Sequence, residues 1–170
     1  TILSSIHKSR SSNLGASFAL IEKYNSNLLC LSGGRNGLCG VNSLNESALS
    51  TELTIKRISE LFIDRFYIEI DKTDRQNEEI YNNQSLSLAS KFNLPIVASN
   101  DVLFISDSDY EANEVKVSIN QKTKLDDRVN QNDYSPNQFF KSKKDMNILF
   151  HDYKSAMENI SQIIKRCNFK

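Results

Sequence analysis

A single carboxylate, Asp101, lies where a parallel α/β fold would gather its ligands. It follows the short apolar run of residues 94–98 (LPIVA), which has the length and composition of a buried strand. In such folds ligands contact residues just beyond the carboxyl ends of the strands. Asp101 is therefore a candidate functional carboxylate. An Asx-type turn or a helix cap explains the same residue without a ligand, and both interpretations stay open here.

Two other features of the sequence resemble ligand-binding or catalytic sites: a glycine-rich turn and three pairs of acidic residues. The turn at residues 33–37 (GGRNG) could cradle a phosphate, but it lacks the Lys and Ser/Thr of a P-loop and the spacing of a dinucleotide-binding turn. A strand-ending turn is the favoured interpretation. The acidic pairs adjoin turns or helix starts, where the helix dipole accounts for them without catalysis; they are Glu78/Glu79, Asp107/Asp109 and Asp126/Asp127.

The cysteines and histidines do not form a site in the sequence. Cys30, Cys39 and Cys167 lack the spacing of metal ligands. Cys30 lies within an apolar run and is predicted to be a small buried side chain. His7 and His151 are far from each other and from any acidic cluster, so a surface position is predicted for both.

Composition limits the class of protein. The chain has 170 residues, of which 39% are hydrophobic and 25% charged, as expected for one globular domain. Its 21 basic and 21 acidic residues cancel, which argues against nucleic-acid binding by this chain alone. The basic clusters at 122–128 and 141–144 are interpreted as solvated surface. Apolar runs too short for a bilayer and the lack of a secretory signal predict a cytoplasmic protein with no membrane contact. The start at Thr1, without Met, suggests an excised fragment.

The elements that must position these residues alternate between strands and helices. Three short apolar runs predict strands at 27–32, 65–70 and 94–98, of a kind normally covered on both faces, and the middle one (RFYIEI) alternates with the periodicity of a strand. Helices are predicted at 18–24, 46–62, 80–92 and 109–119. A further helix is predicted to begin at a capping box formed by Ser142 and Asp145 and to end at Phe150. The last predicted helix has Asp152 as its N-cap and an apolar stripe of Ala156, Ile160, Ile163 and Ile164. Repeated strand–helix units predict an α/β fold with parallel strands and flanking helices.

Six ordered segments together resemble the PHP (polymerase and histidinol phosphatase) domain of bacterial DNA polymerase III alpha subunits, most closely the proteobacterial form. The match extends over essentially the whole chain. The segments are LSGGRNG (31–37), RFYIEI with the acidic stretch after it (65–79), LPIVASNDVLFISDSDYEANEV (94–115), TKLDDR (123–128), YSPNQFFKS (134–142) and ENISQIIKRCN (158–168).

The resemblance implies the later part of a distorted (β/α)₇ barrel whose active members hold a metal cluster. Residues 1–170 would then form an incomplete PHP domain that lacks the front of the barrel and the polymerase core. Three of the family's ligand positions fall within the chain, at Gly34, Asp101 and Leu103. Glycine and leucine cannot coordinate a metal, so Asp101 would be a vestigial ligand. No catalytic or cofactor-binding residue is expected.

The implied function is non-catalytic. The segment would brace the alpha subunit of the replicative polymerase and dock its proofreading exonuclease subunit within the polymerase III holoenzyme. DNA would be contacted only through the parent chain, a DNA-directed DNA polymerase. Mg²⁺ or another divalent metal is implied for that parent and for active PHP relatives, and no cofactor for this segment. The alternatives are a metal-dependent phosphoesterase or 3′–5′ exonuclease active in the intact parent, and a small stand-alone ligand-binding protein.

Overall fold

The computed structural model describes residues 16–37, 39–40, 48–125 and 134–168. The predictions for residues 1–8, His7, Asp126, Asp127 and Arg128 lie outside these ranges. In chain order the elements are α2 (Phe18–Tyr24), β1 (Cys30–Leu31), the 3₁₀ turn η1 (Gly34–Asn36), α4 (Ala48–Leu61), β2 (Phe66–Asp71), α5 (Glu78–Lys91), β3 (Ile96–Ser99), the 3₁₀ turn η2 (Asp107–Asp109), α6 (Tyr110–Gln121), α7 (Lys143–Leu149) and α8 (Lys154–Arg166).

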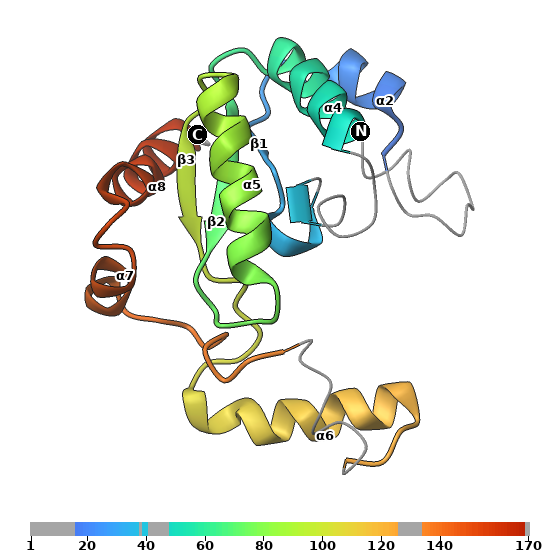
Figure 1. Ribbon diagram of the computed structural model, residues 1–170, viewed down its shortest axis with the longest axis vertical. Helices are drawn as coiled ribbons and strands as arrows, with labels where there is room; N and C mark the ends of the chain where they lie inside the picture. The colour runs from blue at the N-terminus through green and yellow to red at the C-terminus, as the bar shows by residue number, and fades with distance from the viewer. Residues whose placement is uncertain (1–15, 38, 41–47, 126–133, 169–170) are drawn as a thin grey trace.

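The three strands form a parallel sheet in the order β1–β2–β3 (Figure 1). Cys30 pairs with Phe66 in the first ladder, and Ile68 pairs with Ile96 in the second. Parallel neighbours need a crossover connection. α4 lies in the connection from β1 to β2, and α5 lies in that from β2 to β3. The predicted α/β class with parallel strands and flanking helices is confirmed.

Helices α4, α5 and α8 pack against one face of the sheet. Side chains alternate along a strand, so Phe66, Ile68 and Ile70 share a face that is covered by two apolar clusters. One cluster joins this face to α4 and α5 through Ile55, Ile58, Phe62, Leu88 and Ala89, and the other joins it to Phe150 and to Ala156 of α8. The opposite face carries Glu69 and Asp71. This arrangement is compatible with part of a barrel.

Strand β1 differs from its predicted length and burial. β1 has two residues instead of six, and both Leu28 and Leu31 are exposed, because β1 is an edge strand of the described sheet. β2 is buried at all its residues except Glu69, in agreement with the expectation that such parallel strands are covered on both faces. The cause is its central position, which adds neighbours on both sides.

The helices begin and end close to their predicted positions, but the buried face of α4 differs from the apolar pattern of its sequence. Leu49 and Leu53 recur at helical spacing in α4, as core residues would, yet they are 66% and 60% exposed. The buried residues of this helix are Thr51, Ile55 and Ile58, a stripe at helical spacing that includes a threonine.

The predicted helix cap is confirmed for α7 and wrong for α8. Ser142 and Asp145 form the predicted capping box of α7. Asp152 was wrongly predicted to cap α8: the cap is Tyr153, and Asp152 instead pairs with His151 across 2.9 Å. Of the predicted α8 stripe, Ala156 is buried and Ile164 is exposed, because the helix covers the sheet only over its earlier turns.

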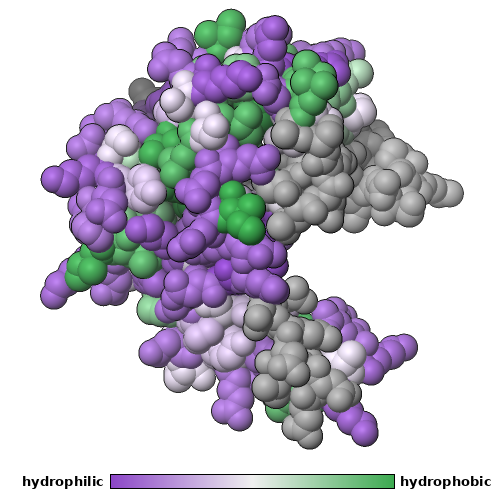
Figure 2. All heavy atoms as spheres, in the orientation of Figure 1, coloured by the Kyte–Doolittle hydropathy of each residue, from purple (hydrophilic) through white to green (hydrophobic). Residues whose placement is uncertain are grey.

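Surface features complete the description. Figure 1 shows α6 lying away from the sheet. Figure 2 shows a mostly hydrophilic face on which hydrophobic atoms form separate patches. Among the described residues, no helix combines the length and apolar character that a bilayer crossing requires.

Candidate functional site

The carboxyl ends of the three strands bring a charged cluster together. η1 follows β1, Asp71 is the last residue of β2, and Asp101 lies two residues beyond β3. Arg75, from the loop between β2 and α5, reaches into the same place. The predicted position of Asp101 at the strand ends is thus confirmed, and Asp71 and Arg75 join it.

Arg75 is paired with both carboxylates. Its Nη1 lies 2.6 Å from Oδ2 of Asp101, and its Nη2 lies 3.7 Å from Oδ2 of Asp71. The side chains of Arg75 and Asp71 are 3% and 2% exposed, whereas that of Asp101 is 34% exposed. Charges this deeply buried are stable only when they are paired and hydrogen-bonded. The three residues therefore form one electrostatic unit.

A hydrogen-bonded loop holds Arg75 in position. Nε of Arg75 donates to Oγ1 of Thr73 at 2.9 Å. The carboxylate of Glu78 accepts from the backbone N–H of Thr73 at 2.8 and 2.9 Å, from its hydroxyl at 2.6 Å and from the N–H of Asp74 at 3.3 Å. Glu78 does begin α5, as its interpretation as a helix-start acid requires. Its hydrogen bonds give it a second role, which is to fix the loop that carries Arg75.

Asp101 serves neither as a helix cap nor as an Asx-type turn. The next helical residues begin at Asp107, and the N–H of Leu103 donates to the carbonyl of Gln138 at 2.9 Å. The side chain of Gln138 is fully buried and donates to the carbonyl and to Oδ2 of Asp101 at 3.2 and 3.3 Å. Asp101 has a positive φ of 39°. The ion pair with Arg75 and the contacts with Gln138 hold this backbone conformation.

The glycine-rich turn is directed at the protein's own carboxylates. The N–H of Gly33 donates to Glu69, and the N–H of Arg35 donates to Oδ2 of Asp71 at 3.2 Å. Gly37 closes the turn by donating to the carbonyl of Gly34 at 3.2 Å. The predicted strand-ending turn is confirmed, and two of the N–H groups that a phosphate cradle would need are already used.

Burial sets the protonation of the two β2 carboxyls. It raises the pKa of Glu69, against the hydrogen bond from Gly33. It also raises the pKa of Asp71, against the hydrogen bond from Arg35 and the charge of Arg75. The hydroxyl of Tyr81 donates to Asp71 at 3.2 Å, and burial raises the pKa of this phenol. Burial thus shifts all three pKa values toward the neutral forms, and at Asp71 the charge of Arg75 opposes this shift.

The three family ligand positions do not fit a metal cluster. Gly34 has no side chain, and a Cβ there would lie 2.5 Å from Oδ2 of Asp71. Leu103 is aliphatic and forms, with Asp101 and Arg75, part of the wall of a cavity of about 350 Å³. Asp101 is engaged by Arg75. Within the described ranges, no three His, Cys, Asp or Glu side chains come close enough to hold a metal ion together.

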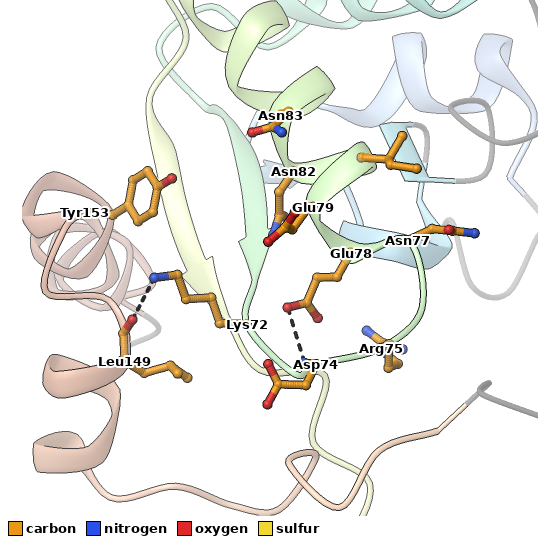
Figure 3. A pocket seen from close by; sticks show the side chains of 11 residues that line it. Lys72, Asp74, Arg75, Asn77, Glu78, Glu79, Asn82, Asn83, Leu149 and Tyr153 are labelled. Carbon is orange, nitrogen blue, oxygen red and sulfur yellow. Dashed lines mark hydrogen bonds between the residues drawn. The ribbon is translucent and has the colours of Figure 1, made fainter.

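A larger polar cavity of about 1040 Å³ lies between the start of α5 and the α7–α8 connection. Figure 3 shows Lys72 extending across it toward Leu149, whose carbonyl accepts from Nζ at 2.9 Å. The ammonium group also lies 5.6 and 5.2 Å from the ring centres of Phe150 and Tyr153. Lys72 therefore connects the loop after β2 to the C-terminal helices.

The cysteines and the described histidine lie outside the cluster of Asp71, Arg75 and Asp101. Cys30 is half-buried against the core, and burial with the nearby Glu69 raises its pKa to about 11. Cys39 is buried and Cys167 is exposed. His151 is exposed at the end of α7, so its predicted surface position is confirmed.

Sequence reasoning missed Asp71 and Arg75. The rule that selected Asp101 applies equally to Asp71, which ends a strand, and Arg75 follows four residues later. The alternating pattern of the middle strand ends at Ile70, one residue before Asp71. One more residue would have revealed a second strand-end carboxylate with a cation close to it in sequence.

No protein-family model matches the chain, but individual sequences do. It is 40% identical over 149 residues to DNA polymerase III subunit alpha of Haemophilus influenzae, 36% over 168 residues to that of Escherichia coli K12, and 38% over 143 residues to that of Pseudomonas aeruginosa. These alignments cover 88%, 96% and 84% of the chain. The chain spans only 13%, 14% and 12% of the respective relatives.

Proposed function

We propose, from the homology of this chain to one segment of the bacterial DNA polymerase III alpha subunit, that it is a non-catalytic PHP-type part of the replicative polymerase. Its role is to brace the polymerase and to dock the proofreading exonuclease subunit in the cytoplasm. DNA synthesis and its divalent metal belong to the longer polypeptide. DNA is contacted through that polypeptide and not through this segment alone.

The ion pair between Arg75 and Asp101 carries the non-catalytic part of the proposal. Metal-dependent phosphoester hydrolysis needs several ligands that hold the ion and leave room for an activated water. Of the three family positions in this chain, only Asp101 offers a carboxylate, and its Oδ2 faces Arg75 at 2.6 Å. Partners in the surrounding shell cannot replace missing ligands.

The brace and docking roles are supported by a buried sheet beside an accessible groove. β2 is almost fully buried between its neighbours, which favours a rigid support. The polar cavity beside α5 is lined in part by the exposed Ile80, and Ile148 is exposed on the nearby α7. Exposed apolar side chains within a polar rim are typical of protein-binding surfaces.

A binding experiment with the intact protein tests docking. We expect Ile80→Asp and Ile148→Asp, each introduced into the full-length protein, to weaken binding of the purified proofreading exonuclease subunit by about tenfold or more. Leu49→Asp on α4 is the matched control, because Leu49 is equally exposed but lies on another helix. Biolayer interferometry measures the three affinities. Unchanged binding after deletion of residues 1–170 would overturn the docking role.

The rival phosphoesterase or exonuclease function has its own test. Nuclease activity of the intact protein is measured with Mn²⁺ or Mg²⁺ before and after Asp101→Ala. The proposal expects no metal-dependent nuclease activity that depends on Asp101. Activity that disappears with this substitution would establish the rival function instead.

A further inference from the structure

We propose that the guanidinium of Arg75 is the resident cation of the strand-end cluster and takes the place of a metal ion between Asp71 and Asp101. A metal of the kind that the family implies does not fit the ligand positions of this chain. The cluster nevertheless contains two carboxylates at neighbouring strand ends, one of them almost fully buried. Arg75 supplies the positive charge that this arrangement needs.

The geometry assigns separate nitrogens of Arg75 to the two acids. Nη1 contacts Asp101 at 2.6 Å and Nη2 faces Asp71 at 3.7 Å. Guanidinium is planar, carries its charge at any physiological pH and is more weakly hydrated than an ammonium group. It can therefore bridge two carboxylates in a buried site where a lysine could not reach both.

The surroundings of Arg75 are built to hold it there. Its Nε donates to Thr73 at 2.9 Å, and the buried Glu78 fixes Thr73 through three hydrogen bonds of 2.6, 2.8 and 2.9 Å. The loop is thus ordered before any ligand arrives. A side chain that merely covered the surface would not need a buried acid of its own to orient the loop.

The same contacts engage the Oδ2 atom of each carboxylate, whereas the buried Oδ1 of Asp71 has no hydrogen-bond partner among the described residues. Oδ2 of Asp71 accepts from the N–H of Arg35 and the hydroxyl of Tyr81, both at 3.2 Å. Oδ2 of Asp101 accepts from Arg75 and Gln138. A metal ion would have to displace Arg75, whose buried charge would then have no partner among these acids.

Charge rescue in the intact protein tests this role. Arg75→Met keeps an unbranched side chain, shorter than that of arginine, and removes its charge, and the triple variant D71N/R75M/D101N also removes both negative charges. We expect hydrogen exchange of the amides at 71–78 and 99–103 to accelerate about tenfold or more in Arg75→Met and to return to within about threefold of the wild type in the triple variant. Arg57→Met is the control, since Arg57 forms an exposed pair with Glu22.

Two results would overturn the proposal. One is equal exchange in Arg75→Met and the triple variant, because a packing role of Arg75 cannot be rescued by neutralising acids. The other comes from electron paramagnetic resonance of added Mn²⁺. If the wild-type protein binds an Mn²⁺ ion that Asp101→Asn abolishes, the cluster holds a metal despite Arg75. Equal Mn²⁺ binding by the wild-type protein and the Asp101→Asn variant supports the proposal.

Discussion

A Cβ atom on Gly34 would lie 2.5 Å from Oδ2 of Asp71, although the two residues come from different strand ends. Gly34 also has a positive φ of 53°, where a side chain is strained. The absence of a side chain at this position is therefore a structural requirement of the turn as well as the loss of a ligand.

This contact predicts that Gly34→Ala destabilises the protein by about 3 kcal/mol, from the left-handed backbone and the steric contact together. Urea unfolding measures the loss. In an Asp71→Ala background the steric part disappears, so the same substitution should cost about 1–2 kcal/mol there. An equal loss in both backgrounds would show that Asp71 does not restrict the turn.

Glu78→Gln tests the loop that carries Arg75. The amide keeps one acceptor oxygen and brings an N–H₂ group toward the donors of Thr73. We expect a loss of about 1–3 kcal/mol in the free energy of unfolding. Glu79→Gln is the matched control on the next, exposed residue and should change stability by less than about 0.5 kcal/mol. Similar effects of the two substitutions would contradict the loop-fixing role.

The raised pKa of Glu69 predicts that the stability of the protein depends on pH. Burial raises its pKa above the ordinary value of 4.5 in the folded protein, so the folded state binds the proton more tightly than the unfolded state does. Its contribution is fully present below pH 4.5 and is lost as the pH rises through the folded pKa.

Glu69→Gln removes the titratable carboxyl group. The unfolding free energy of the wild type minus that of the variant should therefore fall as the pH rises from about 4 to 8. Denaturant titrations at several pH values measure it. Glu60→Gln, on an exposed residue of α4, is the control. A difference that stays level or grows with pH would refute the raised pKa.

The raised pKa of Cys30 predicts that its thiol reacts more slowly than that of Cys167. With a pKa raised to about 11, it is roughly one part in a thousand thiolate at pH 8. The exposed Cys167 should therefore react first with iodoacetamide in the native protein, as followed by peptide mass spectrometry. In urea the two cysteines should react at similar rates. Equal rates without urea would show that Cys30 is accessible and ionised.

Local signals explain what could be predicted from the sequence. Strands and helices were located correctly because hydrophobic periodicity reflects burial within a few residues. The capping box of Ser142 and Asp145 was located for the same reason, since its hydrogen bonds span three residues. The turn after β1 was recognised from Gly33 and Gly34, both of which have positive φ.

Burial of particular faces could not be predicted in this way. Leu49 looks like a core residue in α4 and is exposed, whereas Thr51 is fully buried. The reason is that a helix turns toward whichever neighbours the sheet supplies, and an edge strand such as β1 supplies few.

The amino-acid sequence by itself determined the parallel α/β class, the relationship to a known family and the position of Asp101 beyond a strand. Only the tertiary structure decided what Asp101 does. Its partner Arg75 lies 26 residues earlier in the chain and on a different loop, so no local pattern links them. They meet because parallel strands bring their carboxyl ends to one edge of the sheet. The low polarity of that buried edge then requires each charge to find an opposite one.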